Sequence, residues 1–220
     1  MKRAIIIGSS GGIGAAISSA LTARGVQVTG LSRTTHGLDV TDPPSVERVL
    51  GAQEGPFDLL MVASGVLAPS GSRPEKSLDQ IDAAEMAHVM AVNAIGPALI
   101  LRHAPRLLPV DSQAIVAVLT ARVGSIADNH LGGWYSYRAS KAAANQVVRT
   151  AAIEIGRKRK HAIVVALHPG TVETAFTQAY GNHAKVAPDE AAQNLLHVMD
   201  GLTSSDTGGF FDWRGERVPW

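Results

Sequence analysis

The sequence has no cysteine, few aromatic residues and almost no net charge. The absence of cysteine excludes disulfides, thiol chemistry and cysteine-ligated metal sites, and it suits the cytoplasm. Basic and acidic residues number 20 and 19, which leaves a net charge of +1. Such a balance provides no strong electrostatic field to attract nucleic acid or an acidic membrane surface. We therefore expect neither as a partner.

Long apolar runs are also missing. No stretch approaches the ~20 apolar residues of a transmembrane helix. The run Ala4–Ile7 is shorter than the roughly 7–15 apolar residues of a signal peptide, and glycines follow it.

The histidines lack metal-ligand spacing, so no metal is expected. The one dense basic run, Arg157–His161, falls where a helix should end and where cations complement the helix dipole. These absences predict a soluble cytoplasmic protein.

What is present is an ordinary globular composition. The 220 residues are 45% hydrophobic and 18% charged, which fits one large domain. Short apolar, β-branched runs recur without polar alternation, as expected of parallel strands that are covered on both faces. They predict strands at Ala4–Ile7, Gln27–Leu31, Leu59–Ala63, Ala114–Leu119 and Ala162–Leu167, with a last short strand near Gly209–Asp212.

Helical patterns lie between these runs. They predict helices over Gly12–Arg24, Pro44–Leu50, Ala83–Leu107, Tyr137–Arg159 and Pro188–Asp200. Alternating strands and helices are typical of a doubly wound α/β fold, in which helices cover both faces of a parallel sheet in three layers. No linker or repeat interrupts the pattern, so residues 1–220 are predicted to form a single Rossmann-type domain.

The first predicted strand runs directly into GSSGGIG. Gly8, Gly12 and Gly14 allow a sharp turn and a close approach to a phosphate, and the following helix offers free N–H groups at its N-terminus. We assign these glycines, with Ser10 and Ile13, to a dinucleotide-binding turn. The alternative is a tight strand-to-helix connection without a ligand.

The second predicted strand ends at Leu31-Ser32-Arg33. Where this fold binds NAD, an acidic residue commonly holds the ribose hydroxyls here, whereas an arginine suits the additional phosphate of NADP. Arg33 therefore favours NADP(H) over NAD(H), the alternative being a solvated loop arginine. In LDVTD, Asp39 could accept a hydrogen bond from the adenine amino group, with Val40 next to it.

The stretch YSYRASK places Tyr137 four residues before Lys141. On a helix these two side chains lie one above the other on the same face. Taken alone, the pair also fits an amphipathic helix whose polar residues point into solvent.

The motifs taken together resemble the short-chain dehydrogenase/reductase family, in particular its small members similar to the C-factor signalling protein and the sniffer-type carbonyl reductases. The resemblance covers nearly the whole chain. It rests on the glycine turn, LDVTD, VNAIGP (Val92–Pro97), YSYRASK (Tyr135–Lys141), HPGTVET (His168–Thr174) and the closing GGFFDWRGERVPW.

The resemblance implies that Tyr137 is the general acid/base. A phenol with a pKa of about 10 holds its proton tightly at neutral pH. The ammonium group of Lys141, together with the positive nicotinamide of the oxidised cofactor, is expected to lower that pKa. By resemblance Lys141 also holds the nicotinamide ribose. Asn93 matches the asparagine that kinks its helix and keeps a water molecule in a proton relay.

The resemblance also assigns HPGTVET to the segment that closes over the nicotinamide. The backbone of Val172 and the hydroxyl of Thr174 would bind the carboxamide, and Pro169 and Gly170 would shape the turn. The following segment, 175–186, would cover the substrate.

Two positions depart from the family pattern. In VASG the family often has Asn-Asn-Ala-Gly, but Ala63 and Gly65 still permit a close approach of the backbone to the cofactor. In TARVGS, Ala121 occupies the place of the catalytic serine, so one hydrogen bond to the substrate oxygen is missing. Ser125 is the candidate substitute donor, whereas alternation along the strand should point Thr120 away from the substrate.

The sequence thus predicts an NADP(H)-dependent oxidoreductase that acts on a small carbonyl or alcohol substrate. The alternative, motivated by Ala121, is a cofactor-binding signalling or sensor protein with weak or no turnover. Ala-rich surfaces on the helices at 86–108 and 137–155 predict a homodimer or homotetramer formed through them.

Overall fold

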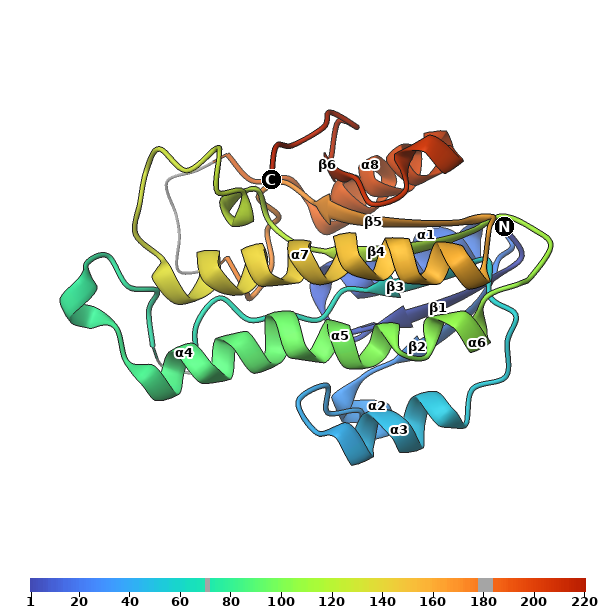
Figure 1. The fold of residues 1–220 in the computed structure, drawn as a ribbon, viewed down its shortest axis with the longest axis horizontal. Helices are drawn as coiled ribbons and strands as arrows, with labels where there is room; N and C mark the ends of the chain where they lie inside the picture. The colour runs from blue at the N-terminus through green and yellow to red at the C-terminus, as the bar shows by residue number, and fades with distance from the viewer. Residues whose placement is uncertain (70–71, 178–183) are drawn as a thin grey trace.

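The computed structural model describes residues 1–69, 72–177 and 184–220. Six parallel strands form one sheet in the order β2-β1-β3-β4-β5-β6 (Figure 1). The predicted fold, a single-domain doubly wound α/β sheet, is confirmed. The strands are β1 (Arg3–Ile7), β2 (Gln27–Leu31), β3 (Leu59–Val62), β4 (Ala114–Leu119), β5 (Ala162–His168) and β6 (Phe210–Asp212).

The helices alternate with the strands along the chain. They are α1 (Gly12–Ala23), α2 (Arg33–His36), α3 (Pro43–Gly51), α4 (Ala83–Met90), α5 (Gly96–Leu101), α6 (Ala104–Leu107), α7 (Tyr135–Lys158) and α8 (Pro188–Gly201). Short 3₁₀ turns occur at Leu78–Gln80 (η1), Arg122–Gly124 (η3) and Ser204–Asp206 (η4), and a π-helical turn, η2, spans Ala91–Ile95.

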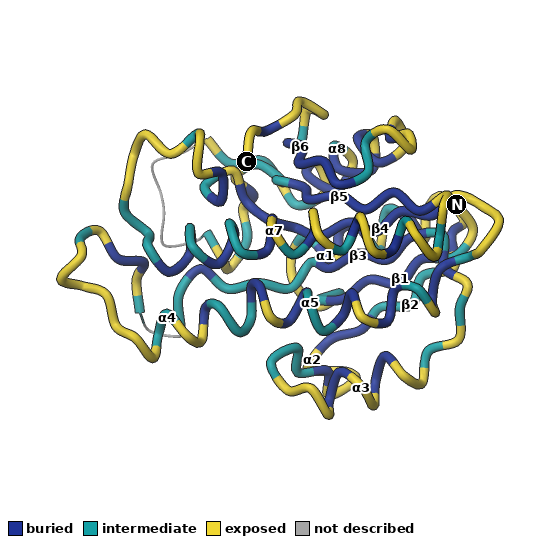
Figure 2. Tube along the Cα trace, viewed as in Figure 1, coloured by how far each residue is buried: buried dark blue, intermediate teal, exposed yellow. Residues whose placement is uncertain are grey.

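Alternate strand residues enter two cores, one on each face of the sheet. Side chains of α3, α5, α6 and α7 pack on one face, and those of α1 and α8 pack on the other. Strands β1, β3, β4 and β5 are accordingly almost entirely buried (Figure 2), whereas the edge strand β2 is only partly buried. Because both faces are covered, the strands carry the continuous apolar runs seen in the sequence.

The sheet has its topological switch point at β1. The chain goes from β1 to β2 on one side and then returns to place β3 on the other side of β1. Connections leaving two neighbouring strands in opposite directions open a crevice at their carboxyl ends, and this crevice is where such folds bind ligands.

The predicted continuous helix over Ala83–Leu107 is interrupted. The π-helical turn η2 separates α4 from α5, and a second break at Arg102-His103 precedes α6. Apolar periodicity alone does not reveal an extra residue in one turn.

The expectation that no stretch is apolar enough to span a membrane is also wrong. The run Ala83–Leu101 passes that test by length and composition, with a mean hydropathy of 1.4. In this fold its residues Val89, Ile100 and Leu101 are buried inside the molecule, and α4 and α5 pack against α7.

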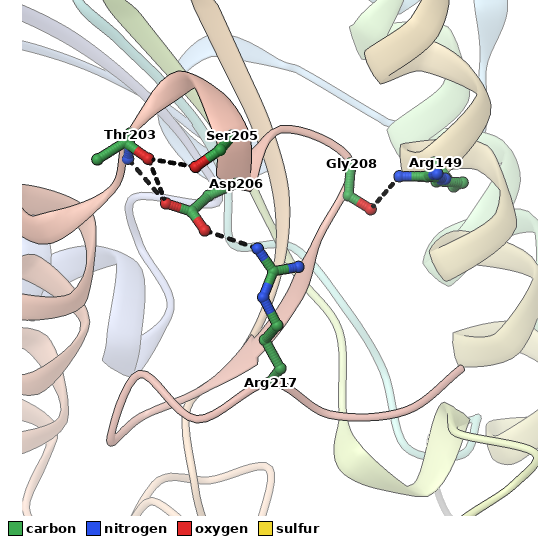
Figure 3. A network of polar contacts seen from close by, with 6 residues as sticks. All are labelled: Arg149, Thr203, Ser205, Asp206, Gly208 and Arg217. Carbon is green, nitrogen blue, oxygen red and sulfur yellow. Dashed lines mark hydrogen bonds and ion pairs between the residues drawn. The ribbon is translucent and has the colours of Figure 1, made fainter.

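A polar network holds the chain between α8 and β6 in place (Figure 3). The carboxylate of Asp206 accepts hydrogen bonds from the backbone and hydroxyl of Thr203 and pairs with Arg217 at 2.7 Å. Arg149 of α7 donates to the carbonyl of Gly208 at 3.2 Å. These contacts place β6 beside β5, so that Asp212 becomes the register neighbour of His168.

The turn between β1 and α1 is closed by backbone contacts that tolerate no side chain. Gly8 has a φ of +85°, and a Cβ atom there would lie 2.8 Å from the backbone nitrogen of Ser64. A Cβ on Gly14 would lie 2.2 Å from the carbonyl oxygen of Gly8. Since these neighbours are backbone atoms, they cannot move aside independently of the turn.

We predict that Gly14→Ala lowers the free energy of unfolding by about 1–3 kcal/mol, as overpacking typically does, and weakens dinucleotide binding. Gly156→Ala in α7 is the matched control, because no atom lies within 4 Å of its added Cβ. That change should stabilise the protein by up to about 1 kcal/mol through helix propensity. Urea denaturation measures both effects, and equal effects of the two substitutions would contradict this account of the turn.

Candidate active site

A cavity of about 600 Å³ opens where strands β1, β3, β4 and β5 end. Segments that follow each of these strands line it, together with the N-terminal part of α7. The lining includes Gly11–Ile13, Ala63–Ala68, Ser72–Arg73, Leu119–Val123, Tyr137, Lys141, His168–Val172 and Thr174–Thr177. The cavity therefore lies at the edge where this topology is expected to bind ligands.

Ten of the predicted site residues line this cavity. They are Gly12, Ile13, Ala63, Gly65, Tyr137, Lys141, Pro169, Gly170, Val172 and Thr174. Gly8 and Gly14 form the turn beneath them, and Ser10 is exposed at its tip. Arg33, Asp39 and Val40 stand after β2, outside the cavity lining, and Asn93 is buried under it.

The N-terminus of α1 faces this cavity. Its N-cap, Gly11, provides no side-chain cap, so the first N–H groups of the helix are open to a ligand. A Cβ on Gly12 would lie 2.5 Å from Cγ2 of Thr174, so the turn and the segment after β5 are in close contact. The arrangement suits a phosphate group held by free N–H donors and the positive end of the helix dipole.

Two charged side chains follow β2: Arg33 is exposed, whereas Asp39 is hydrogen-bonded within its own loop. Arg33 opens α2 with an exposed side chain, and the hydroxyl of Ser32 caps that helix by accepting from the backbone of Thr35. Asp39 accepts from the hydroxyl of Thr41 at 2.7 Å and from its backbone at 2.9 Å. These hydrogen bonds, with the charge of Arg33, hold the pKa of Asp39 below its usual value.

Tyr137 and Lys141 are both buried, with 6% and 4% of their surfaces exposed, so the alternative of two solvent-facing side chains is wrong. The ammonium nitrogen of Lys141 lies 5.7 Å from the centre of the Tyr137 ring and donates to the carbonyl of Leu119 at 3.0 Å. The rings of Trp134 and Phe176 contact the Tyr137 ring edge-on, with centroids 6.1 and 5.9 Å away. The phenol thus sits against an apolar wall.

Burial shifts the two groups in opposite directions. Loss of hydration raises the pKa of the Tyr137 phenol above its ordinary value of 10.0 and lowers the pKa of the Lys141 amine to about 8. The sequence predicted that Lys141, together with an oxidised nicotinamide, would lower the pKa of Tyr137. Desolvation is what raises that pKa in this structure, and the joint effect of the ammonium and the nicotinamide stays a prediction. The phenol is protonated at neutral pH.

Asn93 lies in the π-helical turn η2, where its side chain joins three segments. Its Oδ1 accepts from the backbone nitrogen of Val66 at 2.9 Å, and its Nδ2 donates to the carbonyl of Val66 and to Oγ of Ser140. The helix is irregular at Asn93, as the resemblance implied. A Cβ on Gly65 would lie 3.3 Å from Asn93 Oδ1 and 3.5 Å from Lys141 Nζ, so both side chains approach Gly65 closely.

The position of the missing serine is clear in the structure. Ala121 is 7% exposed and packs in a small cluster with Leu67 and Tyr137. Ser125 does not line the cavity, and its hydroxyl accepts from the backbone of Asp128 at 3.1 Å. Ser125 is therefore not placed to hold a substrate oxygen. Thr120 does line the cavity, contrary to the simple alternation argument, because the chain leaves the strand at Leu119.

The segment after β5 closes another side of the cavity. Gly170 has a φ of +79°, and a Cβ there would lie 3.1 Å from the ring of Trp213. The hydroxyl of Thr177 donates to the carbonyl of Val172 and accepts from the backbone of Thr174. Ala175, Phe176 and Thr177 line the cavity, whereas positions 178–183 of the expected covering segment lie outside the described residues.

Three buried polar atoms along the cavity have no hydrogen-bond partner among the described residues. They are Oγ of Ser64, Oγ1 of Thr120 and Nδ1 of His168. Buried polar groups in native proteins are nearly always hydrogen-bonded, so these atoms are fitted to a polar ligand or to water. Burial lowers the pKa of His168 to about 4, so its imidazole is neutral around pH 7.

Sequence reasoning gave no role to His168, Arg73 or Arg122, all of which line the cavity. His168 lies within a quoted motif, but its neighbours come from other strands. Arg122 pairs with Asp128 at 2.6 Å and approaches Asp212 at 3.7 Å. No group of three or more potential metal ligands occurs within residues 1–69, 72–177 and 184–220.

Comparison with known proteins identifies relatives of the chain. A family model described as enoyl-(acyl carrier protein) reductase matches residues 7–199. The C-signal protein of Myxococcus xanthus is 37% identical over 169 residues, which cover 76% of this chain and 94% of that protein. A 1-hydroxy-2-glutathionyl-2-methyl-3-butene dehydrogenase of Rhodococcus sp. (strain AD45) is 30% identical over 241 aligned positions that cover all of both chains.

Solved structures show the same fold. The NADPH-bound carbonyl reductase from chicken fatty liver superposes with a TM-score of 0.85 at 24% identity, covering 100% of this chain and 99% of that one. The carbonyl reductase Sniffer of D. melanogaster gives a TM-score of 0.82 at 18% identity and covers both chains fully. The structural similarity shows the fold, and the sequence matches show the family. This chain belongs to the short-chain dehydrogenase/reductase family of oxidoreductases.

Proposed function

We propose that this protein is an NADP(H)-dependent oxidoreductase that interconverts a small carbonyl compound and its alcohol, with Tyr137 as general acid/base. The observation that carries the proposal is the buried Tyr137–Lys141 pair at the wall of the cavity. A protonated phenol next to an amine whose pKa is lowered to about 8 is suited to delivering a proton to a carbonyl oxygen. The chicken fatty liver enzyme, which shares this fold, is an NADPH-bound carbonyl reductase.

The residues present fit the cofactor. The glycine turn and the free N–H groups of α1 would hold the phosphates, and the unpartnered Ser64, Thr120 and His168 provide polar contacts along the cavity. Exposed Arg33 would bind the additional phosphate, which favours NADP(H) over NAD(H). Pro169, Gly170, Val172 and Thr174 would contact the nicotinamide end. When bound, the cofactor supplies or accepts the hydride.

Side chains of the protein itself would transfer the proton to or from the substrate oxygen. Tyr137 donates from a site that packing with Leu67, Trp134 and Phe176 shields from water. The ammonium nitrogen of Lys141 lies 5.7 Å from the centre of the Tyr137 ring, and its lowered pKa lets it exchange protons near neutral pH. Asn93 uses its amide to fix Val66 and Ser140, and we propose that it also retains a relay water behind Lys141.

We propose further that the helices at 86–108 and 137–155 associate with a second copy of the chain. Ile95 and Ile153 on these helices are 52% and 54% exposed, which is high for large apolar side chains. A homodimer or homotetramer and a cytoplasmic location remain predictions of the sequence.

Tyr137→Phe should lower kcat for NADPH-dependent carbonyl reduction by about 10²–10⁴, the usual contribution of a general acid. Tyr135→Phe is the matched control, because Tyr135 does not line the cavity and its loss of a hydroxyl should leave kcat unchanged. NADPH oxidation with a panel of aldehydes, ketones and quinones measures both. Full activity in Tyr137→Phe would remove the tyrosine from the mechanism.

The pH profile of kcat/KM should fall as pH rises through about 8, because Lys141 loses its charge there. His168 titrates near 4 and Tyr137 above 10, so neither produces this limb. Lys158→Met, on the same helix but 59% exposed, should retain the limb. A profile that stays flat from pH 7 to about pH 9.5 would contradict a protonated Lys141 in the mechanism.

The second candidate function is that of a cofactor-binding sensor or signalling protein with weak turnover. It is favoured by Ala121, which puts a methyl group against Tyr137 where the family has a hydroxyl donor. Under this hypothesis the protein binds NADP(H), and its function does not depend on carbonyl turnover.

Ala121→Ser separates the two candidates. If the protein is a reductase that lacks one donor, adding the hydroxyl beside Tyr137 should raise kcat by up to about 10²–10³, the effect of one preorganised donor. Ala127→Ser, at an exposed position, controls for the substitution itself. Tight NADPH binding with no carbonyl turnover in either the wild type or Ala121→Ser would favour the sensor reading.

A further inference from the structure

Glu75 stands out because it is buried in a loop far from any sequence motif. Its side chain belongs to the connection between β3 and η1, and only 6% of the residue is exposed. Among the described residues, Asp212 is the only other buried acidic residue. Burying a carboxyl group is unfavourable unless hydrogen bonds compensate it, so its partners are informative.

Within the described residues, the hydrogen-bond partners of Glu75 lie at and just before the start of α7. One carboxylate oxygen accepts from the hydroxyl of Ser136, and the other accepts from the backbone nitrogen of Ser136 at 3.3 Å. The backbone carbonyl of Glu75 accepts from the backbone nitrogen of Trp134. Ser136 is itself 3% exposed, so the contact is shielded from water.

Helix α7 needs this partner because it has no cap of its own. Its N-cap residue, Trp134, is in the left-handed region with a φ of 53° and makes no capping hydrogen bond through its side chain. The first turn of α7 contains no acidic residue. The free N–H groups and the positive end of the helix dipole favour a carboxylate at this end. Glu75 supplies it from 61 residues away in the sequence.

The capped turn carries the phenol. Tyr137 follows Ser136 directly, and the Trp134 ring packs edge-on against the Tyr137 ring. The loop that bears Glu75 also contributes Leu67 to the cavity, next to Val66, which is bound by Asn93. Glu75 therefore joins the cavity loop to the first turn of the catalytic helix.

We propose that Glu75 is a positioning residue that holds Tyr137 in its reactive place by capping α7 from the β3–η1 loop. The inference rests on the proposed reductase function. Glu75 affects the position of the phenol and does not contact the glycine turn, which connects β1 to α1. Loss of Glu75 should therefore lower kcat and leave the affinity for NADPH as it was.

The test compares Glu75→Ala with Glu75→Gln. Alanine removes both side-chain contacts, and kcat should fall on the order of tenfold to a hundredfold, as displacements of about 1 Å in catalytic groups do. Glutamine can accept from the backbone of Ser136 and donate to its hydroxyl, so it should restore kcat to within about threefold. The dissociation constant for NADPH, measured by fluorescence, should stay within about twofold of the wild-type value.

Two further variants complete the design. Glu190→Ala removes an exposed carboxylate from the first turn of α8 and should leave kcat unchanged. Ser136→Ala deletes one of the two side-chain contacts and should give an intermediate loss of kcat, which decides the question if Glu75→Ala does not fold. If Glu75→Ala folds and retains the wild-type kcat, the proposal is overturned. If Glu75→Ala does not fold, a folded Ser136→Ala with the wild-type kcat overturns it.

Hydrogen exchange separates this inference from the proposed function. In Glu75→Ala the amides of residues 134–138 should exchange at least about tenfold faster, while those of the β1–α1 turn should not change. If the wild type reduces no carbonyl compound, the proposed function fails, and the exchange of this segment still decides whether Glu75 holds the first turn. Unchanged exchange at 134–138 would refute the positioning role.

Discussion

The burial of Tyr137 and Lys141 side by side is the constraint on which the rest of the site depends. Each ionisable group loses hydration, so each is pushed towards its neutral form. The amine retains one strong partner, the carbonyl of Leu119 at the end of β4. That contact fixes Lys141 of α7 to the end of β4. Because Tyr137 precedes Lys141 by one helical turn, its phenol then lies at the cavity wall.

Close backbone approaches complete the site. Gly8 and Gly14 allow the first turn to close on itself, and Gly65 leaves room for Asn93 and Lys141. The π-helical turn at Asn93 directs its amide to Val66 and Ser140, which connects α4–α5, the loop after β3 and α7. Three segments far apart in the sequence are thereby fixed to one another beside the Tyr137–Lys141 pair. At Ala121 a methyl group packs against Tyr137 where the family has a serine hydroxyl.

Local patterns explain what the sequence could predict. Each strand was predicted to within a residue or two. The signal is clearest for β1, β3, β4 and β5, which are apolar runs buried on both faces. The Tyr137–Lys141 pair and the glycine turn are also local, since their geometry follows from helix spacing and from positive φ at Gly8. The family motifs then implied the roles of these residues.

What escaped prediction depends on contacts between distant segments or on desolvation. The break of the long helix at Ala91–Ile95 leaves the apolar pattern intact. Ser125 was the candidate substitute donor, but in the fold its hydroxyl accepts from the backbone of Asp128 and does not line the cavity. Glu75 reaches Ser136 across 61 residues, and no periodicity signals such a contact. The direction of the Tyr137 pKa shift follows from burial, which the sequence does not give.

The most direct test of the central claim is the ionisation of the Tyr137 phenol in the cofactor-free protein. The difference in phenolate absorbance between the wild type and Tyr137→Phe, followed from pH 8 to about pH 11.5, isolates this one group. The account predicts that its proton is lost only above pH 10.0, because burial raises the pKa. Ionisation of Tyr137 at or below pH 10.0 would show a hydrated or charge-stabilised phenol and would contradict the buried pair described above.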